Sequence, residues 1–501
     1  MRRKLFYNTF TSLLLQLVTV VCGFILPRYI LLYFGSDVNG LVSSITRFLS
    51  LITFLEMGVG AVIQSSLYEP LAMKNSSKIS EIIVSGSDFF KKIARILLVY
   101  VVILIMFFPA ISSTSEHYDW LYTAVLIASI SISSFAQYYF GIIDRILLAA
   151  DQKGYIQYTA QIITLLMNTL ISVVLIKNGA SIQAVKLISS LIFLVRPLVL
   201  RVYVNKTYII NRKLKISGEP IKQKWNGIAQ HIAAIVLSDT DTVVLTIFST
   251  MANVSIYSVY FMVVNGVKCL LEAFTSGMHA VIGDLWARKE YERLNTFFGN
   301  VELFIHFATT LIFSCTLVLI IPFVRLYTTG VSDVNYMQPV FAVLLVAAYG
   351  MYCLRMPYIM VILAGGHYKQ TQNCFIIAAI LNIVVSVLSV SKWGLVGVAI
   401  GTLVAMVYQT VWMALYDSKN LIKCSFGNCM RQCLIDIGSV ILIYFLSGFI
   451  NINIASYVDW GLMAVFVFFI ACIVTVGLNI IFNKNKMKKF IEFVIKKRTF
   501  V

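Results

Sequence analysis

Charged residues are scarce in this chain of 501 residues, at 12% of the sequence, whereas apolar residues make up 59%. A soluble globular domain carries about 25% charged and about 45–50% apolar residues. So little charge cannot cover a surface that faces water, and the scarcity therefore excludes a soluble protein. Apolar stretches of about 20 residues, the length that crosses a bilayer as a helix, recur from Phe10 to Phe482. The sequence predicts an all-α integral membrane protein.

Motifs of several enzyme classes are also missing. No GxxxxGK[ST] loop is present, which argues against ATP hydrolysis by this chain, and neither HExxH nor GxSxG occurs. No predicted outer loop is long enough for an extracellular catalytic site. Cys424, Cys429 and Cys433 cluster, but their spacing matches no zinc motif and no histidine stands beside them. We therefore predict a protein that is not an enzyme, without a cofactor or metal site, although coupling to H⁺ or Na⁺ stays open.

Basic residues are distributed with a strong bias between the predicted loops. With both termini in the cytoplasm, the outer loops carry only Lys177, Arg325 and Lys392, and most of the 40 basic residues fall in inner segments. This is the bias of the positive-inside rule, and it explains the net charge of +18 without nucleic acid as a partner. The fourteen predicted spans are 10–34, 39–64, 93–112, 119–143, 154–176, 181–201, 226–248, 254–284, 300–324, 336–363, 371–390, 394–416, 432–450 and 457–482.

The spans divide into two halves. We predict an N-terminal six-helix bundle at 1–201, a basic cytoplasmic linker at 202–225, a C-terminal six-helix bundle at 226–416, and helices 13–14 with a basic tail at 417–501. Residues 58–63 and 277–282 match at four of six positions, at equivalent places in the two halves. Duplicated halves around a site at the bilayer midplane are typical of transporters. The long inner connection at 65–92 is amphipathic and is predicted to lie on the membrane surface.

Span eight carries a polar stripe. Asn265, Lys268, Glu272, Ser276 and His279 are spaced three or four residues apart, so they share one face of a helix. Lys268 and Glu272 can form an ion pair at i,i+4. The stripe is explained either by a structural ion pair between helices or by the wall of an aqueous cavity, and its length favours the cavity.

Two aspartates lie near the middle of span seven. Asp239 and Asp241 point away from each other on a regular helix. One of them could bind a coupling cation or proton, and an ion pair with an intramembrane Arg or Lys is an equal alternative. In span two, Arg47 lies too deep to reach the interface easily and is predicted to face a cavity, with Glu56 on the opposite face.

Four further cations lie within spans. Arg28 is close to the outer end of span one, where it could reach the interface or face the cavity. Arg355 precedes Pro357, which is expected to break span ten. Lys186 and Arg196 lie near opposite ends of span six, and we interpret Lys186 as an interfacial anchor. Several cations around one cavity suit an anionic substrate, because fixed positive charge offsets the desolvation of phosphate.

Loose motifs in a fixed order add a family resemblance. They are Leu26-Pro27-Arg28-Tyr29 followed by Phe34-Gly35, Asp239-Thr240-Asp241-Thr242-Val243-Val244 leading to Ile256-Tyr257-Ser258, Ala364-Gly365-Gly366-His367-Tyr368-Lys369-Gln370-Thr371, and residues 382–402 with Gly394, Gly397 and Gly401-Thr402. With these motifs, nearly the whole chain resembles the Wzx-type oligosaccharide flippases, the polysaccharide transporters of the multidrug/oligosaccharidyl-lipid/polysaccharide superfamily.

The resemblance implies fourteen transmembrane helices, with two six-helix bundles in an inverted V around a central cavity and two C-terminal helices outside it. It implies that undecaprenyl-diphosphate-linked oligosaccharide moves from the inner to the outer leaflet of the bacterial cytoplasmic membrane by alternating access, for capsule or surface polysaccharide. Its partners would be that lipid-linked glycan, membrane lipids, a polysaccharide polymerase and glycosyltransferases.

On this hypothesis the basic residues in the spans contact the diphosphate or an acidic sugar, and the acidic residues set ion coupling or helix pairing. The substrate-binding candidates are Arg47, Lys268, Arg355, Arg28 and Arg196, and the coupling or ion-pair candidates are Asp239, Asp241, Glu272, Glu56 and His279. A multidrug antiporter of the same fold is the alternative, and it would favour an acidic cavity. A membrane polymerase or ligase would be expected to need a substantial outer loop.

Overall fold

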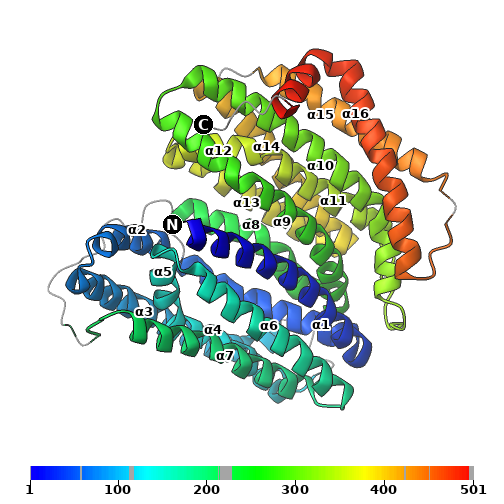
Figure 1. Ribbon diagram of the computed structural model, residues 1–501. Coiled ribbons are helices and arrows are strands. Elements are labelled where there is room, and N and C mark those ends of the chain that lie inside the picture. The colour runs from blue at the N-terminus through cyan, green and yellow to red at the C-terminus, as the bar shows by residue number, and fades with distance from the viewer. Residues whose placement is uncertain are drawn as a thin grey trace. The chain divides into compact units, whose positions relative to one another are not determined.

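The computed structural model describes residues 2–56, 59–111, 118–212, 214, 228–422, 425–450 and 452–495. Regular secondary structure within these ranges is entirely helical (Figure 1). Twelve helices in the described residues are long and apolar enough to cross a membrane. The chain is therefore a multi-pass membrane protein.

The helices follow one another with short connections. Their bounds are α1 Arg2–Ser50, the 3₁₀ turn η1 Leu51–Leu55, α2 Val59–Ala72, α3 Ser76–Ile111, α4 Trp120–Ala136, the π-helical turn η3 Gln137–Gly141, α5 Ile142–Ala150, α6 Gly154–Lys177, α7 Ile182–Thr207, α8 Ile228–Phe248, α9 Met251–Ala287, α10 Tyr291–Tyr327, α11 Pro339–Leu354, α12 Met356–Ala364, α13 Tyr368–Trp393, α14 Leu395–Asn420, α15 Phe426–Ser447 and α16 Tyr457–Ile495.

The predicted count of fourteen transmembrane helices is confirmed. Helix α1 contains two of the predicted spans, because Gly35 adopts φ 83 and ψ 179 and breaks the helix between them. Glycine tolerates this positive φ without a steric penalty. Helix α8 supplies the span predicted at 226–248.

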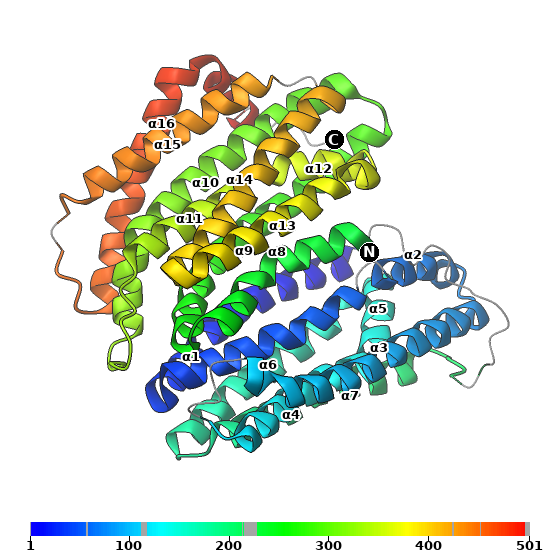
Figure 2. The same ribbon diagram turned by 180° about the vertical axis from the view of Figure 1, so that it is seen from behind.

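The chain forms two compact units, an N-terminal unit of residues 1–255 and a C-terminal unit of residues 256–501. In the N-terminal unit α1 packs against α6, and α4 and α6 pack against α7. In the C-terminal unit α10, α15 and α16 lie alongside one another in both views (Figures 1 and 2), and α14 packs against α11 and α13. Most of the predicted linker, at 213 and 215–227, lies outside the described residues, as does Gly58 of the predicted repeat.

The segment predicted to lie on the inner membrane surface is placed differently. Residues 76–92 continue without interruption into the third predicted span as the single helix α3. Ile79, Ile82, Ile83 and Phe90 are buried inside the protein. The amphipathic pattern therefore reflects packing within the N-terminal unit, because a helix with one buried face shows the same periodicity on a membrane surface and in a core.

Glycines hold α13 and α14 together as the sequence predicted. Gly394 joins the two helices with φ 53. A Cβ atom at Gly397 would lie 2.5 Å from the Ser389 carbonyl oxygen, and one at Gly401 would overlap Ser386 Oγ. Only a residue without a side chain permits this close approach of two helices.

Candidate functional site

Span ten breaks at Arg355. Helix α11 ends at Leu354, Arg355 adopts φ −81 and ψ −11, and α12 begins at Met356. Pro357 lacks the backbone N–H that would continue the hydrogen-bond ladder, and its ring disfavours an unbroken helix. The predicted break is therefore present, and it fixes Arg355 at the junction of two helices.

Tyr352 lies between two cations. The ring centroid is 4.2 Å from the guanidinium carbon of Arg355 and 4.7 Å from Lys268 Nζ. The Tyr352 hydroxyl donates a hydrogen bond of 2.9 Å to Glu272 Oε1. Lys268 Nζ lies 3.6 Å from the same oxygen, so the predicted i,i+4 pair is present. These four residues, from α9, α11 and the α11–α12 junction, are called the Tyr352 cluster below.

The Tyr352 cluster has more positive than negative charge. Arg355 is only 6% exposed, and within the described part of the chain it forms no ion pair. Its Nη1 approaches Met406 Sδ at 3.6 Å, which is a weak acceptor. Arginine stays protonated even when buried, and a buried charge is costly without a partner. The cluster therefore has the capacity to bind an anion.

The N-terminal unit pairs its intramembrane charges. Arg47 Nη1 lies 2.8 Å from Asp239 Oδ1, and Ser50 Oγ donates to Asp239 Oδ2 at 3.0 Å. Arg145 Nη2 lies 2.9 Å from Glu56 Oε1. Of the two roles predicted for Asp239, an ion pair with an intramembrane cation is the one that this geometry displays.

Polar cavities occupy the interior of the same unit. One of about 290 Å³ is lined by Arg145 and Arg196 together with polar residues that include Gln137, Gln157 and Gln161. A second, of about 370 Å³, is lined by Glu56, Lys186 and several hydroxyl side chains. Cavities of several hundred cubic ångströms are large enough for a small ligand or part of a larger one. Their lining combines three cations with one carboxylate.

The remaining predicted residues have separate environments. Arg196 donates to Thr164 Oγ1 at 3.3 Å, Asp241 is 2% exposed, and Arg28 and His279 are partly buried in α1 and α9. Lys186, interpreted from the sequence as an interfacial anchor, lines a cavity instead. Position near a span end could not reveal this, because α7 continues beyond the predicted end of its span at 201 to Thr207.

Two participants were missed by the sequence interpretation. Tyr352 belongs to an apolar run and gives no signal of its own. Arg145 was assigned to an inner loop, but a π-helical turn at Gln137–Gly141 leads directly into α5, which carries Arg145 toward the cavities. The polar residues Gln137, Asp144 and Arg145 were the available signal, and π-helical turns are frequent at functional sites.

The helical architecture and buried charges define the protein as a polytopic membrane protein of the transporter type. The fold is similar to that of the lipid II flippase MurJ in an inward closed conformation, with a TM-score of 0.68 and 14% identity, over 93% of this chain and 98% of that chain. It is also similar to a point mutant of the Vibrio cholerae MATE transporter VcmN, with a TM-score of 0.58, 15% identity, and 85% and 98% of the two chains covered.

A third similar structure is a ligand complex of the MATE multidrug transporter DinF-BH, with a TM-score of 0.51, 14% identity, and 82% and 93% of the chains covered. No family model matches the sequence, and no curated protein matches it significantly. The chain thus has the fold that flippases and MATE transporters of the multidrug/oligosaccharidyl-lipid/polysaccharide superfamily share. At this low identity the likeness establishes the fold.

Proposed function

We propose that this protein is a flippase for undecaprenyl-diphosphate-linked oligosaccharide, as the resemblance of its motifs to Wzx-type flippases implies. The observation that carries the proposal is the Tyr352 cluster, in which Arg355 and Lys268 face one carboxylate, Glu272. A diphosphate would supply the missing negative charge, because charge-assisted hydrogen bonds from arginine to phosphate are strong and directional. The fold similarity to a lipid II flippase supports a lipid-linked cargo of this kind.

The aromatic ring gives the cluster a second property. Tyr352 holds both cations through cation–π contacts, which orient them without neutralising their charge. An anion can therefore approach cations that are already in place, and less side-chain entropy is lost on binding than with free lysine and arginine chains. We assign Arg355 and Lys268 to the diphosphate, and Arg47 to an ion pair with Asp239.

The proposed cellular setting is the bacterial cytoplasmic membrane with both termini in the cytoplasm. Transport would be driven by an ion gradient or the membrane potential, and the acidic residues Asp239, Asp241 and Glu272 are the proposed coupling groups. The chain would release its cargo unchanged, so it is proposed as a transporter and not as an enzyme.

A reconstituted system tests the proposal. Proteoliposomes with the purified protein receive a fluorescent undecaprenyl-diphosphate-linked glycan in the inner leaflet, and a membrane-impermeant quencher reports its arrival outside. We expect translocation by the wild type and by Arg293→Gln, whose side chain is 78% exposed, and loss with Arg355→Gln. Efflux of a cationic dye without movement of the glycan would instead assign the protein to the multidrug antiporters.

A further inference from the structure

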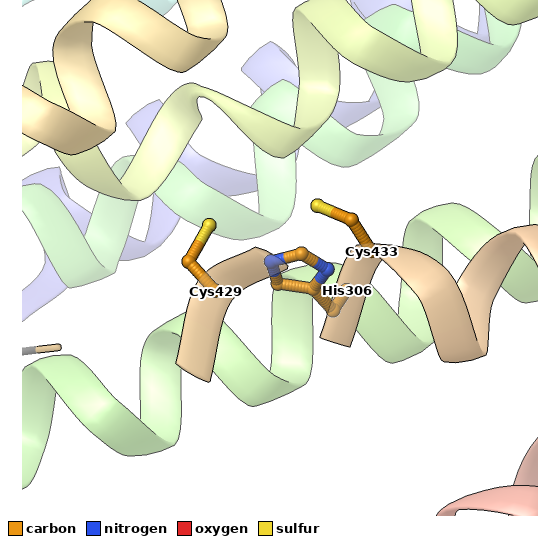
Figure 3. A group of neighbouring side chains, drawn as sticks. All are labelled: His306, Cys429 and Cys433. Carbon is orange, nitrogen blue, oxygen red and sulfur yellow. The ribbon is translucent and has the colours of Figure 1, made fainter. Parts of the chain in front are cut away.

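Three potential metal ligands meet in the C-terminal unit. Cys429 and Cys433 lie four residues apart on α15 and so share one face of that helix. His306 comes from α10, and its imidazole lies between the two cysteine side chains in Figure 3. One potential ligand atom from each of the three residues lies within 4.8 Å of the others. Because His306 is more than a hundred residues away in sequence, the spacing of the cysteines alone predicted no metal site.

The imidazole of His306 is buried and only half satisfied. The residue is 0% exposed. Its Nδ1 lies 2.5 Å from Asp436 Oδ2, whereas its Nε2 has no hydrogen-bond partner. A buried polar atom without a partner costs about 1–3 kcal/mol. A histidine that gives one ring nitrogen to a carboxylate and keeps the other for a metal ion is the usual arrangement of metal-binding histidines.

Further polar groups surround the sulfur atoms. The Tyr358 hydroxyl lies 2.9 Å from Cys429 Sγ and 2.7 Å from Glu302 Oε1. Gln432 Nε2 donates to Asp436 Oδ1 at 3.2 Å. Each group around the three ligands is thus held by a second contact. Such outer contacts orient the ligands of metal sites.

We propose that His306, Cys429 and Cys433 bind a transition-metal ion that prefers sulfur and nitrogen, with zinc as the representative ion. Two thiolates neutralise a divalent ion, so the loaded site adds no net charge to the buried region. Zinc–sulfur bonds of about 2.3 Å and zinc–nitrogen bonds of about 2.0 Å place tetrahedral ligand atoms less than 4 Å apart. Rotation of the cysteine side chains would close the remaining gap. Three protein ligands leave a fourth position for water.

The proposed role of the ion is to fasten α15 to α10. Helices α15 and α16 follow the last helix of the C-terminal six-helix bundle, and α10 packs against both of them. Ligands on α10 and α15 would connect this outer pair to the bundle through bonds much stronger than apolar contacts. Binding releases the two thiol protons and stabilises the folded state by mass action.

The first experiment uses the full-length protein in detergent under reducing conditions, without substitutions. Titration with Co²⁺ should produce a thiolate-to-cobalt charge-transfer band and the visible bands of tetrahedral cobalt, and added Zn²⁺ should bleach both. Metal analysis after desalting should find about one zinc ion per chain. Zinc should also raise the Tm, and a chelator should lower it again. Absence of the thiolate band, or zinc far below one per chain, overturns the proposal.

Substitutions assign the ligands. Cys429→Ser, Cys433→Ser and His306→Gln should each weaken zinc binding severely, and Asp436→Asn should weaken it by about 10–100-fold. Cys472→Ser is the matched control, because Cys472 is a free thiol on α16; it should bind zinc like the wild type. Unchanged stoichiometry in the Cys429→Ser/Cys433→Ser double variant overturns the assignment. The readout is metal binding, so its outcome is independent of whether the protein moves a lipid-linked glycan.

Discussion

The guanidinium carbon of Arg355 lies 4.2 Å from the ring centroid of Tyr352, at the point where α11 gives way to α12. The same ring is 4.7 Å from Lys268 Nζ on α9. One aromatic side chain therefore organises two cations from different helices. Substitutions at the three positions separate the contributions of charge and of stacking.

Arg355 is predicted to bind the anionic part of the cargo. Arg355→Gln should reduce the affinity for undecaprenyl diphosphate in detergent by at least about tenfold, which corresponds to about 1.4 kcal/mol. Arg355→Lys should retain only part of the affinity, because lysine keeps the charge but loses the planar stacking and the forked donors. Arg293→Gln, in an exposed i,i+3 pair with Glu290, is the control for general loss of positive charge. Equal affinity of wild type and Arg355→Gln would remove Arg355 from the site.

Tyr352 is predicted to act through its ring more than through its hydroxyl. Tyr352→Phe keeps both cation–π contacts and loses the 2.9 Å hydrogen bond to Glu272, so cargo affinity should fall by less than about fivefold. Tyr352→Leu removes the ring and should reduce affinity more strongly. Binding of undecaprenyl diphosphate to the two variants, with Tm measured in parallel, checks the order. A Phe variant as weak as the Leu variant would show that the hydroxyl is decisive.

The pair of Arg47 and Asp239 is predicted to be structural in its first effect. Asp239 has a side chain 9% exposed, so Arg47→Gln leaves a buried carboxylate without its cation and should cost about 1–3 kcal/mol. The double variant Arg47→Gln/Asp239→Asn removes both charges and should be more stable than Arg47→Gln alone. Thermal unfolding of the single and double variants forms the cycle that isolates the pair. Strictly additive losses would mean that the two charges do not interact.

Much of the helical framework could be predicted from the sequence, because its determinants are local. The apolar runs give the spans, Gly35 and Pro357 give breaks, and the spacing of Lys268 and Glu272 gives a pair on one helix face. The close packing at Gly401 was predicted from the glycine pattern of a resembling family and is confirmed by the absence of room for a Cβ atom.

Contacts between helices could not be predicted in the same way. Arg47 meets Asp239 across 192 positions, and His306 lies beside Cys429 from another helix. Such meetings depend on the rotation of each helix about its axis and on the helix it faces. A single apolar sequence leaves both open, because in a membrane even the outward face of a helix is hydrophobic.

Asp151 gives the protein a predicted dependence of stability on pH. Burial by itself would raise the pKa of this carboxyl, but hydrogen bonds from Lys153 and Tyr208 and the positive charges of Lys153 and Lys4 outweigh it and hold the pKa below 3.8. Because the folded pKa is the lower one, the stabilisation is complete well above pH 4 and is lost as the pH falls through the folded pKa. Asp151→Asn should lower the Tm at pH 7 and reduce the loss of Tm on acidification. A wild-type slope that persists unchanged in Asp151→Asn would assign it to other carboxylates.

Gly401 is predicted to set the distance between α13 and α14. Gly401→Ala places a methyl group in overlap with Ser386 Oγ, and only 2.8 and 2.9 Å from the Ser386 backbone nitrogen and the Asn382 carbonyl oxygen. Because backbone atoms cannot move aside as a flexible side chain can, the helices must separate, at a cost of about 1–3 kcal/mol. Gly438→Ala on α15 is the matched control, since nothing lies within 4 Å of its Cβ position. There the gain in helix propensity should raise stability by about 0.5–1 kcal/mol. Thermal unfolding in one detergent compares the two variants, and the opposite signs of their shifts separate a packing effect at Gly401 from a general effect of replacing glycine in a membrane helix.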